Sequence, residues 1–187
     1  SAGLLKMDFL GLRTLTIIKD AIAMIEQNLG EKIDIDNIDL NDKLSLELFQ
    51  RGETSGIFQF ESLGMQKYLR DLKPDKFEDL IAMNALFRPG PLAYIPSYIN
   101  RKHGREVVTY DLDDMKEYLE ETYGITVYQE QVMLLSQKIA GFTKEEADIL
   151  RKAMGKKDRK TLDKLKPQFI EQASAKGHDA KKLEKIW

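Results

Sequence analysis

Apolar residues recur at helical spacing along most of the chain, and the first such run begins at Leu12. From there they follow one another three or four residues apart, at Leu15, Ile18, Ile22, Ile25 and Leu29. This spacing places them on one face of a helix, and a glycine such as Gly30 is typical of the residue that ends one. We therefore predict a helix over this run, with its apolar face turned toward a core.

The remaining pattern also predicts mostly helices. Asp42 can cap a short helix that ends at Arg51-Gly52. Thr143 and Glu146 have the spacing of a capping box, so a helix should begin there and run to about Met154, with Gly155 ending it. Further helices are predicted over residues 62–72, 74–87, 94–102, 113–121 and 130–139, and basic amphipathic helices follow. Alternation predicts short extended pieces near residues 5–10 and 56–60, which gives a mainly α fold with a few short strands.

Composition narrows the class of protein. The 187 residues are 42% hydrophobic and 32% charged, which suits one or two globular domains. With no Cys and only two His, disulfides, thiolate zinc sites and histidine-rich metal sites are excluded, so any metal must be held by carboxylates. No apolar stretch approaches the roughly 20 residues needed to cross a bilayer, and no signal pattern opens the chain. We expect a cytoplasmic protein that is neither membrane-spanning nor secreted.

The net charge of −2 conceals a division along the chain. Residues 1–150 carry 17 basic and 26 acidic side chains, a balance of −9, whereas residues 151–187 carry 12 basic and 5 acidic ones, a balance of +7. Clustered Lys and Arg attract phosphates, so the basic segment favours an anionic partner. A solvated helix surface on which charges separate by chance explains the same division.

Four local patterns could carry chemistry, and each also has a purely structural explanation. Lys6 and Asp8 would share one face of a strand, which also describes a surface ion pair. Arg88 precedes Pro-Gly-Pro, a rigid turn that would fix its direction. Residues 123–131 place aromatic and amide groups around a tight turn, which packing alone would explain. The segment 150–157 gathers four cations at a helix end, where cations also complement the helix dipole.

Familiar catalytic motifs are absent. The Gly155-Lys156-Lys157 triplet lacks the first glycine and the hydroxyl residue of a Walker A loop. No G-x-S-x-G elbow or H-E-x-x-H zinc motif occurs, and the adjacent carboxylate pairs occupy helical positions that solvent should reach.

Taken together, the four patterns and their neighbours closely resemble the C-family replicative DNA polymerases of bacteria. The resemblance covers nearly the whole chain in the right order and is carried by Lys6-Met7-Asp8-Phe9-Leu10-Gly11-Leu12-Arg13-Thr14-Leu15, Gly56-Ile57-Phe58-Gln59-Phe60-Glu61-Ser62, Arg88-Pro89-Gly90-Pro91, Thr122-Tyr123-Gly124, Tyr128-Gln129-Glu130-Gln131-Val132-Met133 and Ala147-Asp148-Ile149-Leu150-Arg151-Lys152-Ala153-Met154-Gly155-Lys156-Lys157. It implies that residues 1–11 are the last strand of the palm and residues 12–187 most of the fingers domain. The rest of the palm, the thumb and the duplex-binding parts would belong to a longer parent chain.

The resemblance also implies a reaction and the residues that serve it. The family transfers a nucleotide from a deoxynucleoside triphosphate (dNTP) to a primer 3′-hydroxyl with the help of two Mg²⁺ ions. Asp8 matches a catalytic, metal-binding palm aspartate whose two companions would lie upstream. Nucleotide binding is implied for six cations, namely Lys6, Arg151, Lys152, Lys156, Lys157 and Arg88. At Lys152 the family often has Arg, so this residue would supply charge without bidentate geometry.

Partners follow from the same resemblance: primer-template DNA, dNTP, and the other subunits of the replicase including the sliding clamp, which other parts of the parent would contact. Because this chain would hold only Asp8 and not the two companion aspartates of the metal site, it should have no polymerase activity by itself. A different class of protein stays open, namely a non-enzymatic helical module that binds nucleic acid through its basic segment 151–187. That module would not need Asp8, Arg88 and Arg151 to belong to one site.

Overall fold

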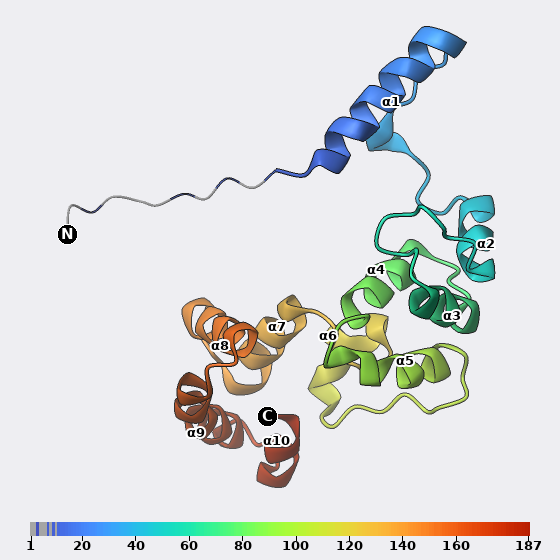
Figure 1. Cartoon of the computed structure of the whole chain (residues 1–187). Helices are drawn as coiled ribbons and strands as arrows, with labels where there is room; N and C mark the ends of the chain where they lie inside the picture. Colours follow the sequence, from blue (N-terminus) through green and yellow to red (C-terminus); the bar gives the residue numbers. More distant parts are fainter. Residues whose placement is uncertain (1–2, 4–6, 8, 10) are drawn as a thin grey trace. The chain divides into compact units, whose positions relative to one another are not determined.

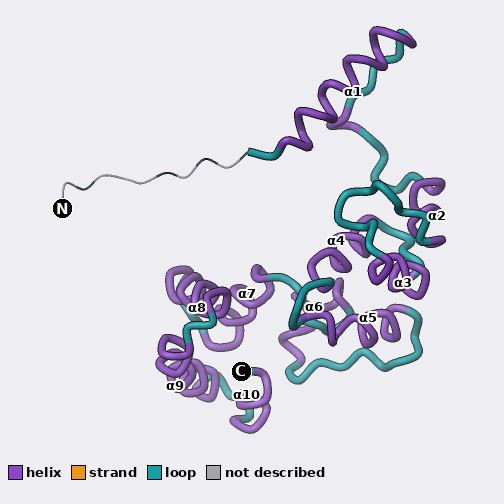
Figure 2. Tube along the Cα trace, viewed as in Figure 1, coloured by secondary structure: helices purple, strands orange, loops and turns teal. Residues whose placement is uncertain are grey.

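The computed structural model describes Gly3, Met7, Phe9 and residues 11–187, and these residues are helical or irregular with no strand among them (Figures 1 and 2). The predicted mainly α fold is therefore confirmed. The predicted strand near residues 5–10 falls largely outside the described residues, together with Lys6 and Asp8. The chain divides into two units, Ser1–Leu40 and Asn41–Trp187. No helix in the described part is both long enough and apolar enough to cross a membrane.

The first unit contains helix α1 (Arg13–Leu29), which ends where Gly30 adopts a left-handed conformation with φ of 73°. The position and the end of this helix agree with the prediction. The prediction that its apolar face turns toward a core is wrong, because no residue of α1 is buried. Leu15 and Leu29 are 65% and 69% exposed, whereas Ile18, Ile22 and Ile25 are half-buried, so the described residues cover only part of the apolar stripe. A short 3₁₀ turn, η1 (Ile35–Asn37), follows, with the Asp34 carboxylate accepting the Asp36 N–H.

The second unit begins with four helices that share one core. These are α2 (Lys43–Arg51), α3 (Leu63–Leu72), α4 (Phe77–Leu86) and α5 (Ile95–Lys102), with the 3₁₀ turn η2 (Pro91–Tyr94) between the last two. Asp42 caps α2 by accepting the Ser45 N–H at 2.7 Å, and Gly52 ends it, both as predicted. The first core, as we call it, includes fully buried Leu69, Met83 and Ile95.

The remaining helices form a second core around Ile139, Phe169 and Leu183. It is built from α7 (Gln129–Ala140), α8 (Lys144–Lys156), α9 (Arg159–Ala175) and α10 (Ala180–Ile186), in which α7 packs on α8 and α9, and α9 on α10. The helix predicted over residues 113–121 is instead three short pieces, η3 (Asp113–Met115), α6 (Lys116–Leu119) and η4 (Glu120–Thr122).

The strand predicted at residues 56–60 is wrong, because this segment is a series of turns. The Ile57 N–H donates to the Thr54 carbonyl at 3.1 Å, and the Phe60 N–H donates to the Ile57 carbonyl at 2.9 Å. The buried Thr54 hydroxyl donates to the Phe60 carbonyl at 2.6 Å and closes the loop. Gln59 has a positive φ of 68°, which an extended strand does not allow. Ile57 and Phe60 are half-buried and Phe58 is exposed, so the side chains do not alternate between two faces as they would in a strand.

The capping box that opens α8 is confirmed. The Thr143 N–H donates to the Glu146 carboxylate at 2.8 Å, and the Glu146 N–H donates to the Thr143 hydroxyl at 3.2 Å. The predicted end of this helix at Gly155 is wrong, since the helix continues to Lys156 and Lys157 takes the left-handed conformation, with φ of 55°. Glycine was a misleading stop signal because a single glycine inside a helix costs only about 1 kcal/mol.

Candidate functional site

Arg151 and Lys152 lie on α8 and share one carboxylate, that of Asp148. The Nε and Nη2 of Arg151 donate to Asp148 Oδ1 at 2.9 and 2.7 Å, and the Nζ of Lys152 lies 2.6 Å from Oδ2. The hydrogen bond from Lys152 and, to a smaller extent, those from Arg151 hold the pKa of the Asp148 carboxyl below its usual range. Each carboxylate oxygen therefore fixes one cation, and the guanidinium of Arg151 has a defined orientation.

The start of α7 lies beside this cluster. The Nη1 of Arg151 donates to the Gln129 side-chain oxygen at 3.4 Å, and Gln129 is the first residue of α7. One turn further along α8, Gly155 also faces Gln129, whose Nε2 would lie 4.0 Å from an added Cβ. A guanidinium has five N–H donors, and Arg151 uses three of them in these contacts. Two donors thus stay available for an anion.

Lys156 and Lys157 extend the positive surface at the C-terminal end of α8. Both side chains are exposed, and neither forms an ion pair with any described residue. With Arg151 and Lys152 they make four cations against two nearby carboxylates, those of Asp148 and of Asp158, which interacts electrostatically with Lys156. Cations in the last turn also stabilise the helix dipole, so these two lysines have a structural role whatever they bind.

Arg88 lies apart from this surface, in the turn after α4. Its N–H donates to the Leu86 carbonyl at 2.8 Å and its carbonyl accepts the Leu92 N–H at 3.1 Å, while Gly90 has a φ of 102°. The turn is therefore defined, as predicted. The exposed Arg88 side chain contacts none of the α8 cations among the described residues, so the structure does not bring Arg88 and Arg151 together.

The metal-binding prediction concerns Asp8, and Asp8 and Lys6 are outside the described residues. Within the described part of the chain, no group of three or more acidic or histidine side chains is arranged to hold a metal ion. The described residues alone therefore do not fit a magnesium centre.

The segment that follows Tyr123 stabilises the fold, which agrees with the interpretation that packing alone explains it. Gln131 is buried, and its amide oxygen accepts the N–H groups of Val127 and Tyr128 at 2.8 and 2.9 Å. Its amide nitrogen donates to the Tyr118 carbonyl at 3.1 Å and to the Thr122 hydroxyl at 2.9 Å. All four bonds that a primary amide forms most readily are made.

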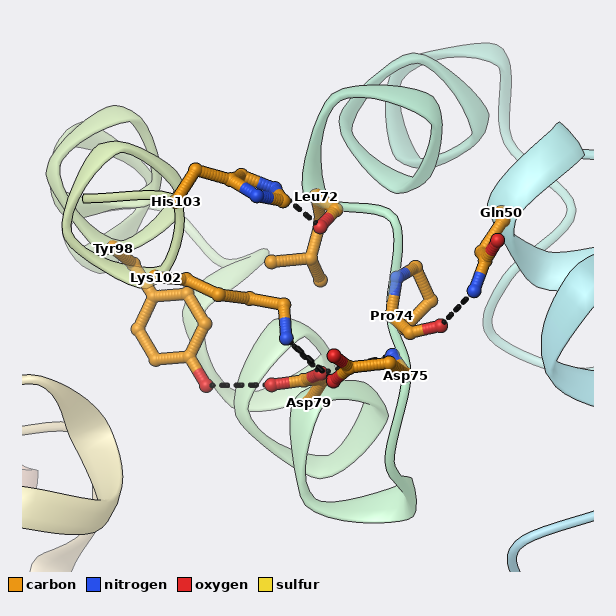
Figure 3. A network of polar contacts seen from close by, with 8 residues as sticks. All are labelled: Gln50, Leu72, Pro74, Asp75, Asp79, Tyr98, Lys102 and His103. Carbon is orange, nitrogen blue, oxygen red and sulfur yellow. Dashed lines mark hydrogen bonds and ion pairs between the residues drawn. The ribbon is translucent and has the colours of Figure 1, made fainter. Parts of the chain in front are cut away.

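A buried polar cluster joins α4 to α5 (Figure 3). The Asp79 carboxylate, which solvent does not reach, receives the Lys102 ammonium at 2.9 Å, the Tyr98 hydroxyl at 3.5 Å and the Asp75 N–H at 3.2 Å. Lys102 also lies 2.6 Å from Asp75 Oδ1. Burial raises the pKa of the Tyr98 hydroxyl. Since every polar end is paired, the cluster stabilises the fold and leaves no group free for catalysis.

Sequence reasoning missed Asp148, Gln129 and the Asp79 cluster. Asp148 carried a usable signal, because it stands three residues before Arg151 and four before Lys152, the spacings at which opposite charges pair on a helix. Gln129 and Asp79 carried none, since their partners are 22 and 23 residues away in sequence.

Comparison with known proteins identifies the family. Residues 14–177 match the model of the bacterial DNA polymerase III alpha subunit finger domain. The chain is 50% identical over 169 residues to the DNA polymerase III subunit alpha of Bacillus subtilis, covering 90% of this chain and 15% of that one.

Two further relatives of the same name give similar values. The protein of Aquifex aeolicus is 48% identical over 187 residues, covering 99% of this chain and 16% of its own. That of Thermus aquaticus is 47% identical over 180 residues, covering 94% and 15%. The chain thus spans about a sixth of the length of these relatives. The predicted resemblance is confirmed, and the chain belongs to the finger-domain family of the bacterial DNA polymerase III alpha subunit.

Proposed function

We propose that this chain is the fingers part of a replicative DNA polymerase, and that it positions the incoming dNTP during template-directed DNA synthesis. Family membership supports the polymerase activity, which we assign to the parent protein. The proposed role in nucleotide binding rests on one geometric observation, the oriented guanidinium of Arg151 in α8, which contacts the first residue of α7.

The triphosphate would meet Arg151 first. Asp148 and Gln129 hold three of its donors, and the two that are left can donate to phosphate oxygens. Arg suits this task because its planar donors match phosphate geometry. Lys152 would add charge without that geometry.

Lys156 and Lys157 would extend the attraction along the same helix end. Because neither forms an ion pair with a described residue, both ammonium groups can still pair with an anion. We propose Arg88 only as a weaker contact to nucleotide or template, since it does not share the α8 surface.

The rest of the proposed chemistry depends on the parent chain. We propose residues 1–11 as the last palm strand, with Asp8 as one metal ligand and Lys6 near the phosphates, and residues 12–187 as fingers. Two Mg²⁺ ions, when bound, would activate the primer 3′-hydroxyl and stabilise the leaving pyrophosphate. Their other ligands must come from outside the described residues, which offer no such group.

The proposed partners are primer-template DNA, dNTP, and the subunits of a cytoplasmic replicase, including its sliding clamp, through other parts of the parent. The helical module suggested by the charge pattern would bind nucleic acid through residues 151–187 without a specific role for Arg151. The two functions therefore differ in what removal of this one side chain should do.

The test is Arg151→Ala in the parent polymerase, with Arg159→Ala as the control. Arg159 lies in the same basic segment, and its side chain forms no ion pair within the described part. A charge-assisted contact contributes about 1.5 to 3 kcal/mol, so Arg151→Ala should lower kcat/KM for dNTP about ten- to a hundred-fold. Arg159→Ala should leave it nearly unchanged, and primer-template binding should survive both changes. Unaltered nucleotide efficiency in Arg151→Ala would refute the nucleotide role.

A further inference from the structure

A groove of about 420 Å³ lies between α3 and α5, away from the Arg151 surface. Its lining combines charged, polar and apolar side chains from both helices and the loops that follow them: Lys67, Tyr68, Arg70, Asp71, Lys73, Pro96, Ile99, Asn100 and Arg105. Lys67, Arg70 and Asp71 are three and four residues apart, which places them on one face of α3.

The groove is positively charged, with four cations against the single carboxylate of Asp71. None of the four forms an ion pair with a described carboxylate. Arg105 donates only to the Asn100 side-chain oxygen, at 3.0 Å. By contrast, the two cations of α5 that stabilise the fold are paired, Arg101 with Glu106 at 2.7 Å and Lys102 with Asp79 at 2.9 Å. The groove cations are thus exposed charges that no described carboxylate neutralises.

A second groove of the same unit has the opposite sign. It measures about 600 Å³, lies between α6 and α7, and is lined by Glu117, Glu120, Glu121 and Glu130 with no cation in its lining. An extended anion would be repelled there and attracted to the α3/α5 groove. Although the net charge of the chain is −2, the α3/α5 groove would thus attract an anion that the α6/α7 groove would repel.

We propose that the α3/α5 groove binds the sugar-phosphate backbone of single-stranded DNA. Grooves that bind single strands combine cations along the backbone path with aromatic or apolar surface for the bases. Tyr68, half-buried with its ring 6.1 Å from that of Phe87, and the exposed Pro96 supply that surface. The proposal goes beyond dNTP binding and does not depend on Arg151.

The test uses the 187-residue chain and a fluorescein-labelled oligothymidylate, with anisotropy titrations at several salt concentrations and no nucleotide present. The groove variant is Lys67→Gln/Lys73→Gln/Arg105→Gln. Arg70 is left in place because it packs on Gly52, where an added Cβ would lie 2.8 Å from its Nη1. The control, Arg13→Gln/Lys19→Gln/Lys144→Gln, makes the same charge change at exposed cations outside both the groove and the basic segment 151–187, and none of them forms an ion pair with a described residue.

Each phosphate contact contributes about 0.7 to the slope of log K against log salt for single strands. Loss of three contacts should therefore reduce the slope by about 2 and weaken binding at low salt at least about tenfold. The control should stay within about threefold of the unaltered chain. Circular dichroism and melting would verify that each variant is folded, and the single change Lys67→Gln should reduce the slope by about a third as much.

Two results would overturn the proposal. One is equal loss in both triple variants, which would mean diffuse attraction, including that of the basic segment. The other is no binding by the unaltered chain at low salt. Because the assay contains no dNTP and measures no synthesis, either result would leave the proposed nucleotide role of Arg151 standing.

Discussion

Lys102 and Asp79 form an ion pair of 2.9 Å in which the lysine side chain is only 7% exposed and the aspartate is not exposed at all. Breaking a buried pair by removing one partner leaves an uncompensated charge and costs about 3 to 5 kcal/mol. Lys102→Met should therefore lower the free energy of unfolding by roughly that amount in a urea titration. Lys116→Met is the matched control, since the Lys116–Glu120 pair of 3.9 Å is exposed and should cost under about 1 kcal/mol. Similar losses in the two variants would contradict this role of burial.

The same cluster should make stability depend on pH at both extremes. The Lys102 hydrogen bond lowers the pKa of Asp75 below 3.8, so its contribution is complete above pH 3.8 and is lost as pH falls through the folded-state value. Burial alone would lower the pKa of Lys102, but hydrogen bonds to Asp75 and Asp79 outweigh it and raise the value above 10.5. That contribution is complete below pH 10.5 and is lost as pH rises further.

Thermal melts across pH would measure both effects by difference. Asp75→Asn should remove the acid-side loss and also reduce the alkaline-side loss, because Asp75 is one of the two carboxylates that raise the pKa of Lys102. Lys102→Met should flatten both sides relative to the unaltered chain. If Asp75→Asn instead changed the alkaline side alone, the pairing would be wrongly assigned.

Gly124 should tolerate alanine much less than Gly104 does. Both have positive φ, 79° and 69°, which costs an L-residue about 1 to 2 kcal/mol. At Gly124 an added Cβ would also lie 2.8 Å from the Thr109 carbonyl oxygen, whereas at Gly104 nothing lies within 4 Å. Such overpacking adds about 1 to 3 kcal/mol. Chemical denaturation should thus show a larger loss for Gly124→Ala, and equal losses would mean that the backbone relaxes freely there.

The 187-residue chain should not extend a primer. Two Mg²⁺ ions need several hard oxygen ligands, and the described residues provide no group able to hold one. Incubation with primer-template, dNTPs and Mg²⁺ should give the same product distribution as buffer, while the whole parent polymerase serves as the positive control. Metal-dependent extension by the pure chain would require a different assignment of its domains.

The sequence predicted correctly those features of the fold that depend on residues close together in the chain. The capping box of Thr143 and Glu146 and the Gly30 helix end depend on residues within four positions of one another, and the structure confirms both. Residues 56–60 misled because their sequence alternates like a strand, although the turns leave Phe58 61% exposed and half-bury Ile57 and Phe60, which are three residues apart. The three-dimensional partners were not predictable, since Lys102 meets Asp79 from another helix.

In the candidate site, too, the local features were predictable from the sequence and the contact between helices was not. The position of Arg151 and Lys152 on a helix followed from periodicity, and their pairing with Asp148 was readable from its spacing. The contact with Gln129 depends on how α7 packs against α8, which no local pattern specifies.

The four hydrogen bonds of Gln131 have a mechanical consequence. Its amide holds Val127 and Tyr128, which pack on the first core, and also Tyr118, which packs on the second. Rotating one core against the other here would break at least two of these bonds, about 1 to 3 kcal/mol, and would strand buried polar groups at further cost. The two cores of residues 41–187 should therefore move together as one rigid body. A displacement of α3, in the first core, should then displace α8, in the second core, by a similar amount.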